Sequence, residues 1–278
     1  MGFCCCFMTK RLLYYKVNVA CVKKLVAILF LSCCNFTLTY GYVNKESPQS
    51  GIVYYASEES LAMLKESNLH DFLILSQNFE PQNNPTYCGI ATANIILNSI
   101  FLPIAKPDSK PKNMVQMPVK TSGKIGIERY FQDQLLNKQT DSKVKLKSVI
   151  EWLQGGDPGL SLKNLKDLLI FYKLNAQSFY ADGSGGYANF IKHLEDNLAK
   201  DDLTFIVVNF DRKTLGFTTG SGHISPLLAY NKQRQMVLVG DVSISSNPWF
   251  WVPVKSMYDA MNTLDGQTYR GYIIVKKM

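Results

Sequence analysis

Apolar side chains recur at helical spacing in the first half of the chain. They predict a helix over Glu58–Lys65, with Ser57 as its cap and Leu61 and Leu64 facing inward. A second helix is expected from Cys88, because apolar residues from Ile90 to Ile100 fall on one face. The same spacing predicts three further helices, over Lys124–Lys138, Ser161–Tyr172 capped by Ser161 with Leu165, Leu168 and Leu169 inward, and Tyr187–Leu198.

The second half of the chain changes to short apolar runs. These predict strands over Phe205–Phe210, His223–Tyr230, Met236–Asp241 and Tyr272–Val275, with one short helix at Val254–Met261. Helices followed by an antiparallel sheet define an α+β fold. With 278 residues and 46% apolar content, the chain can bury a full core as one domain.

The amino-terminal segment differs from the rest and predicts a leader. A basic stretch ends at Lys24 and is followed by an apolar run, Leu25–Leu31, and then by small and polar residues through Gly41. We therefore expect residues 1–41 to be a signal peptide and residues 42–278 to form the folded domain, so that the protein is secreted or periplasmic. A retained membrane anchor is the alternative, although the run is short for a bilayer span.

The leader also explains the basic charge. Five of its residues are Lys or Arg, no acid precedes Glu46, and removing those five charges from the net +8 leaves +3. Such a charge is ordinary for a solvated surface, so no nucleic-acid partner is expected.

Six of the seven cysteines lie in the leader, which leaves Cys88 alone in the remaining chain. An exported domain with one cysteine has no internal disulfide. Cys88 is therefore either a small buried hydrophobic residue or a reactive thiol.

The position of Cys88 favours the reactive thiol. Pro85 resists helix formation upstream, so the thiol falls in the first helical turn, where unpaired N–H groups and the helix dipole favour the thiolate. Downstream, His223 follows two glycines and Asp241 ends an apolar strand, which supplies a base and an orienting carboxylate. Gln82, six residues before the cysteine, is a candidate donor to an oxyanion.

These motifs resemble the phytochelatin synthases. The family pattern of a glutamine six residues before an aromatic-Cys-Gly stands here as Gln82 and Tyr87-Cys88-Gly89. The family's Gly-His-x-Ser-Pro segment stands as Gly222–Pro226, and its Asp-Val pair as Asp241-Val242. Trp251-Val252 and Ala260-Met261 match further downstream, and the resemblance covers about Gly51 to Val275.

The resemblance implies a papain-like cysteine transpeptidase fold, with the Cys88 helix packed against a sheet that carries His223 and Asp241. It implies glutathione as the substrate, cleaved at its Cys–Gly bond through a γ-glutamylcysteinyl thioester on Cys88. Gln82 would serve the oxyanion, and Tyr87, Gly222 and Arg212 would contact substrate. It also implies stimulation by heavy-metal ions such as cadmium or by their glutathione thiolates, with no intrinsic cofactor.

Two positions depart from the family. Members that extend peptides carry an acidic residue four positions before the cysteine and an arginine three after the aspartate, whereas this chain has Asn84 and Ile244. Isoleucine cannot clamp a carboxylate, so we expect hydrolysis to γ-glutamylcysteine and glycine to exceed peptide elongation. Arg212 lies near a family arginine and is a candidate to compensate.

Two other function classes stay open. A papain-like peptidase acting on other peptides would share Cys88, His223 and Asp241. A heavy-metal-binding protein without turnover would need several thiols, and the domain has one. No Cys/His pair has ligand spacing, so no structural metal site is expected, and His70 and His193 are assigned to packing. The sequence leaves a homodimer open.

Overall fold

The computed structural model describes most of the chain after residue 50. All of the described residues belong to a compact unit that spans Glu46–Met278. They are residues 51–102, 129–137, 140, 159–182, 186–198, 202–218, 222–243 and 249–278. The predicted leader, Ile244 and residues 124–128 and 138 of the helix predicted over 124–138 therefore lie outside the described residues.

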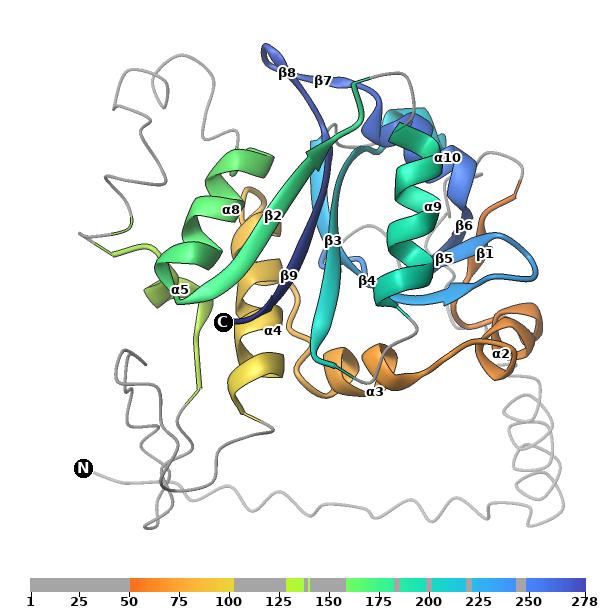
Figure 1. Cartoon of the computed structure of the whole chain (residues 1–278), viewed down its shortest axis with the longest axis horizontal. Coiled ribbons are helices and arrows are strands. Elements are labelled where there is room, and N and C mark those ends of the chain that lie inside the picture. The colour runs from red at the N-terminus through yellow and green to blue at the C-terminus, as the bar shows by residue number, and fades with distance from the viewer. Residues whose placement is uncertain are drawn as a thin grey trace, which may run out of the picture. The chain divides into compact units, whose positions relative to one another are not determined.

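A seven-stranded antiparallel sheet forms the centre of this unit (Figure 1). From one edge to the other its strands are β1 (Val53–Tyr54), β6 (Phe250–Pro253), β5 (Met236–Val239), β4 (Gly222–Asn231), β3 (Thr204–Asp211), β9 (Gly271–Lys277) and β2 (Leu174–Tyr180). A separate two-strand ribbon pairs β7 (Leu264–Asp265) with β8 (Thr268–Tyr269). The predicted α+β class is confirmed.

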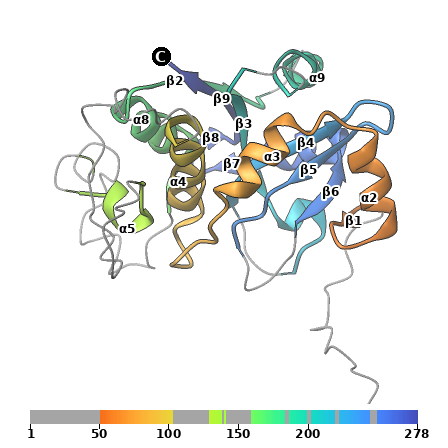
Figure 2. The ribbon, with the colours of Figure 1, turned by 90° about the horizontal axis from the view of Figure 1, so that it is seen from below.

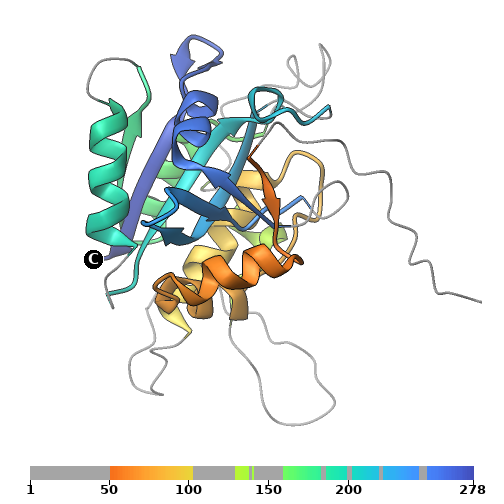
Figure 3. The same ribbon diagram turned by 90° about the vertical axis from the view of Figure 1, so that its right-hand side faces the viewer.

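Helices cover both faces of the sheet. One face packs against α2 (Glu58–Lys65), α3 (His70–Gln77), α4 (Cys88–Phe101), α5 (Gln132–Leu135) and α8 (Leu162–Phe171), and the other against α9 (Gly186–Asn197), α10 (Val254–Met261) and a 3₁₀ turn at Lys213–Leu215. Figures 1 and 2 show α4 and α8 on one side of β3 and β9 and α9 on the other, and in Figure 3 α9 lies beside β9.

Alternation along β3 explains why both faces are buried. Phe205 and Val207 enter the core under α4, whereas Ile206 and Val208 enter the core under α10. A strand that is apolar on both sides needs cover on both sides, which the two helical layers supply.

Helix α4 is buried on every side, not on one face as the apolar spacing suggested. Each residue from Gly89 to Phe101 is buried. Its polar side chains are accommodated by hydrogen bonds: Asn98 bonds the backbone of Tyr130, and Asn94 donates to Glu80. The helix that begins with Cys88 is therefore fixed by the core around it.

The predicted helix over 58–65 and its Ser57 cap are confirmed, but its inward face is partly wrong. Leu61 is 53% exposed, and the buried residues are Ser60, Met63 and Leu64. Ser60 turns inward because its hydroxyl accepts a hydrogen bond of 2.9 Å from the indole of Trp251. Helix α2 therefore turns Ser60 toward the core, where Leu61 was expected.

Of two other helix predictions, one was confirmed and one was largely wrong. Helix α8 is confirmed with a capping box between Ser161 and Asn164, and Leu165, Leu168 and Leu169 are fully buried. Within the predicted helix over 124–138, however, Phe131 is extended and α5 is a single turn. Helix α3 and strands β1, β2 and β6 were not predicted.

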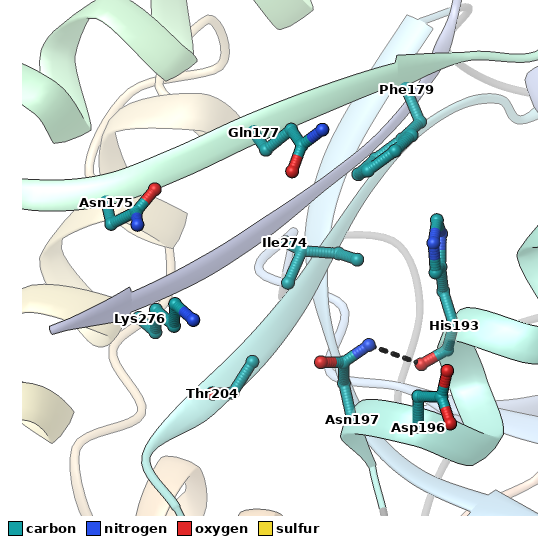
Figure 4. A pocket seen from close by; sticks show the side chains of 9 residues that line it. All are labelled: Asn175, Gln177, Phe179, His193, Asp196, Asn197, Thr204, Ile274 and Lys276. Atoms are coloured by element: carbon teal, nitrogen blue, oxygen red, sulfur yellow. Dashed lines mark hydrogen bonds between the residues drawn. The ribbon is translucent and has the colours of Figure 1, made fainter.

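A cavity of about 330 Å³ lies between α9 and the outer face of β2, β9 and β3 (Figure 4). Its walls are mainly polar and carry His193 on the helix and Lys276 on β9. None of the predicted site residues lines it.

Among the described helices, none combines the length and the apolar character needed to cross a membrane.

Candidate active site

Three elements bring the predicted nucleophile, base and carboxylate together. Cys88 is the first residue of α4, His223 is the second residue of β4, and Asp241 lies two residues beyond the end of β5. The Thr92 hydroxyl of α4 donates to the Ile224 carbonyl of β4 at 3.2 Å, which fixes the helix against the strand. This is the arrangement that the papain-like expectation described.

Asp241 orients His223 through a buried hydrogen bond. His223 Nε2 lies 2.8 Å from Asp241 Oδ1, and the two residues are 5% and 1% exposed. The same carboxylate accepts the Ser243 N–H at 2.8 Å and Arg212 Nη1 at 3.1 Å. Three donors stabilise the ionised carboxylate, and they leave His223 Nδ1 for the thiol.

The surroundings of Cys88 favour its thiolate. Burial by itself raises the pKa of the Cys88 thiol, but the hydrogen bond and positive charge of His223, with smaller backbone contributions from Ile224 and Gly89, outweigh it. The net pKa lies below the ordinary cysteine value. A thiolate at this position is the form that attacks carbonyl carbon.

The same contacts keep His223 protonated at neutral pH. Burial lowers the pKa of His223, but the charge of Asp241, its hydrogen bond and the contact with Cys88 together raise it to about 9. Cys88 and His223 therefore form a thiolate–imidazolium pair across the neutral range. The pair supplies both a nucleophile and a proton donor.

This pair predicts the pH dependence of the site. Alkylation of Cys88 by iodoacetamide, followed by peptide mapping, should reach its plateau at a pH below that of an unperturbed cysteine. Turnover should fall as pH rises through about 9, because His223 then loses the proton it donates. In His223→Ala the alkylation midpoint should rise, since burial is then opposed only by the smaller backbone contributions of Ile224 and Gly89. An unchanged midpoint would contradict the pairing.

Gln82 lies beside the strand that carries the carboxylate. Its N–H donates to the Val242 carbonyl at 2.9 Å, and its side-chain Nε2 donates to the carbonyls of Asn84 and Pro85 at 2.9 and 3.0 Å. The amide thus folds toward the loop that leads to Cys88. An oxyanion would compete with these carbonyls for its N–H groups, and the assignment of Gln82 to the oxyanion stays a prediction.

Arg212, expected to contact substrate, lies against Asp241 in the structure. Arg212 is 3% exposed, its guanidinium bonds Asp241, and it stacks over the ring of Phe217 at 4.9 Å. The hydrogen bond indicates that Arg212 helps to hold Asp241 in place. A contact between Arg212 and substrate stays a prediction.

Tyr87 and Gly222 flank the pair. Tyr87 caps α4 and is half-buried against the core, and Gly222 is exposed at the start of β4. A Cβ on Gly222 would lie 2.8 Å from Nη2 of Arg270. The absence of a side chain at residue 222 therefore lets the guanidinium reach the residue next to His223.

Arg270 is a candidate functional residue that sequence reasoning missed. It is buried, its Nη1 donates to Thr263 Oγ1 and the Leu264 carbonyl, and its Nε is buried without a hydrogen-bond partner. Asp265 lies 3.9 Å from its Nη2. The sequence gave little sign of this role, because an arginine next to a glycine at the start of a strand, as at Arg270-Gly271, is common.

Comparison with known proteins decides the family. The family model described as phytochelatin synthase matches residues 43–272. The chain belongs to the phytochelatin synthase family.

Within the described residues, no group of three or more His, Cys, Asp or Glu side chains is arranged to hold a metal ion.

Curated relatives of this phytochelatin synthase family member include plant and yeast proteins. Glutathione gamma-glutamylcysteinyltransferase 3 of Lotus japonicus is 26% identical over 86% of this chain and 45% of its own length. Glutathione gamma-glutamylcysteinyltransferase of Schizosaccharomyces pombe is 24% identical over 87% of this chain and 52% of its own length. The chain thus spans about half the length of the curated relatives it matches.

Among solved structures, the peptidase domain of Streptococcus ComA, a bifunctional ABC transporter, also matches. It is 14% identical, and the match covers 72% of this chain and 97% of that domain with a TM-score of 0.36.

Proposed function

We propose that this protein is a glutathione γ-glutamylcysteinyltransferase that works through an acyl-enzyme on Cys88. The observation that carries the proposal is the constellation of half-buried Cys88 with buried His223 and Asp241, in a member of the phytochelatin synthase family. The names of the relatives supply the substrate class, and the constellation supplies the chemistry.

In the first step the Cys88 thiolate attacks the carbonyl carbon of the Cys–Gly bond in glutathione. A C–S bond forms, the carbonyl oxygen becomes an oxyanion, and the C–N bond breaks as the His223 imidazolium gives its proton to the glycine amine. Gln82 and the N–H of Cys88 are the proposed oxyanion donors. The second step transfers the γ-glutamylcysteinyl group from sulfur to water or to the amine of a second glutathione, with neutral His223 as base.

Arg270 and Asp265 are the groups proposed to receive the γ-glutamyl end. That end carries an α-carboxylate and an α-ammonium group, and this pair presents the complementary charges beside Gly222. The unpartnered Nε of Arg270 gives a free buried donor for a carboxylate.

Incubation with glutathione and mass analysis of the products tests this function. The expected products are free glycine with γ-glutamylcysteine or (γ-Glu-Cys)n-Gly, and cadmium or its glutathione thiolates should stimulate their formation. Cleavage of unrelated peptides at higher kcat/KM than glutathione would favour the peptidase alternative. Stoichiometric metal binding by the domain without turnover would favour the metal-binding alternative.

The balance of products is a separate prediction. Because Asn84 and Ile244 replace an acidic residue and an arginine, and Arg212 is committed to Asp241, the acceptor glutathione has fewer groups to hold it. Acyl transfer to an amine must outcompete water, which requires a bound acceptor. We expect γ-glutamylcysteine to form faster than oligomers at millimolar-order glutathione. Chromatography showing oligomers as the main early product would contradict this, and Ile244→Arg should shift the ratio toward elongation.

Export is also proposed, on the leader pattern of residues 1–41. Sequencing the amino terminus of the exported protein tests it. A start near residue 42 supports cleavage, and an intact amino terminus supports an anchor.

A further inference from the structure

The side chain of Gln132 spans the two peptide groups around Gln82. Its Nε2 donates to the Pro81 carbonyl at 2.7 Å, and its Oε1 accepts the Asn83 N–H at 3.0 Å. Gln132 is 2% exposed. The one buried amide of Gln132 thus pairs with the carbonyl before Gln82 and with the N–H after it, although Gln132 lies about 50 residues further along the chain.

The backbone of Gln82 itself is hydrogen-bonded to a second distant segment. Its N–H donates to the Val242 carbonyl at 2.9 Å, and Val242 directly follows the catalytic aspartate. The backbone on both sides of residue 82 and at residue 82 is therefore hydrogen-bonded to groups from distant segments. A loop held at three successive positions has little freedom to shift the backbone that carries the Gln82 side chain.

The segment that carries Gln132 is anchored to the cysteine helix. Asn98 of α4 bonds both the N–H and the carbonyl of Tyr130, at 2.8 and 3.1 Å, and is fully buried. Arg129 pairs with Glu80 at 2.6 Å, and Glu80 accepts from Asn94 of α4 at 2.8 Å. The contacts run from the helix of the nucleophile to residues 129–132 and from there to the loop of Gln82.

We propose that Gln132 is a positioning residue for catalysis, which sets the place of the Gln82 amide relative to Cys88. This inference rests on the proposed function and on the oxyanion role of Gln82. An amide is required because one side chain must donate and accept at once, and displacement of a catalytic donor by about 1 Å can cost about 10²-fold in rate.

Four variants test the proposal: Gln132→Leu, Gln132→Glu, Gln82→Ala and the double variant Gln82→Ala/Gln132→Leu. Gln82→Ala should lower kcat about 10²–10³-fold, the typical effect of losing one oxyanion donor. Gln132→Leu should lower kcat about 10–10²-fold with KM changed by less than about threefold, because binding of substrate does not use the oxyanion donor. Gln132→Glu keeps the acceptor for Asn83 and should give a smaller loss.

The double variant separates positioning from general stability. If Gln132 acts through Gln82, adding Gln132→Leu to Gln82→Ala should change kcat by less than about threefold. Equal losses in both backgrounds would overturn the proposal. Gln134→Leu is the matched control, because it replaces a glutamine by leucine in the same helical turn. The side-chain oxygen of Gln134, unlike that of Gln132, has no hydrogen-bond partner. The kcat of Gln134→Leu should be unchanged.

Two further measurements keep the test independent of the substrate and of folding. The rate of Cys88 alkylation should be the same in wild type and Gln132→Leu, since the Cys88–His223 pair is not altered. If wild type fails to turn over glutathione, the proposed function falls. The burst of Cys88 acylation by an activated p-nitrophenyl ester then still reports whether Gln82 and Gln132 are coupled, and additive losses there would reject the positioning role alone.

Discussion

Replacing Cys88 with alanine is expected to abolish turnover of glutathione. Among the residues after the predicted leader, Cys88 is the one cysteine, and it alone is placed to form the thioester beside His223. Without it the acyl-enzyme cannot form, and activity should fall below detection, a loss of at least about 10⁴-fold. The measurement is the rate of glycine release from glutathione by full-length protein.

The controls are a smaller change at the same site and changes elsewhere. Cys88→Ser keeps the shape of the side chain but has a far less acidic nucleophile, so it should be almost as inactive, with an unchanged thermal midpoint. Cys33→Ala and Cys34→Ala, in the leader, should leave the rate unchanged. Product formation by Cys88→Ala at a rate comparable to wild type would end the thiol mechanism.

Asp241→Asn should lower kcat about 10³–10⁴-fold. The carboxylate accepts from His223, whereas a neutral amide stabilises the imidazolium less and can turn its NH2 group toward the ring, which favours the wrong tautomer. The pKa of His223 should then fall from about 9, and the alkaline limit of activity should fall with it. The measurements are kcat and its pH profile.

The structure adds an effect on stability to this variant. Arg212 is buried against Asp241, and breaking a buried ion pair by removing one partner costs about 3–5 kcal/mol. The thermal midpoint of Asp241→Asn should therefore fall. Asp241→Asn/Arg212→Leu should recover much of the stability while leaving kcat low. A single variant that keeps both wild-type kcat and wild-type stability would remove Asp241 from the site.

Local signals in the sequence predicted the parts of the fold that depend on local physics. Ser57 and Ser161 begin their helices as caps, and the end of proline-containing loop 81–87 places Cys88 at the start of α4. Strand β4, which carries the base, and strand β5, which ends two residues before the carboxylate, were found because both are rich in apolar residues. The chain order of Cys88, His223 and Asp241 then predicted the candidate constellation.

Tertiary contacts determined what the sequence did not predict. The inward turn of Ser60 depends on Trp251, far along the chain, and the extended conformation at Phe131 belongs to the segment held by Asn98. Arg212 carries no local sign that its partner is Asp241. The unpredicted β2 is an edge strand with only two fully apolar aliphatic residues, Leu174 and Ala176, among polar neighbours, so its apolar run is short.

The two halves of the catalytic constellation differ in how far apart they lie along the chain. His223 and Asp241 are separated by 18 residues on one antiparallel β4–β5 hairpin, whereas the contact between Thr92 of α4 and Ile224 of β4 spans 132 residues. Closing the short loop costs less chain entropy than closing the long one. The imidazole can therefore be oriented as soon as the hairpin forms, while the thiol keeps ordinary acidity until α4 docks on the sheet. We therefore expect activation of the nucleophile to come late in folding, so that a partly folded chain carries a thiol no more reactive than that of a free cysteine.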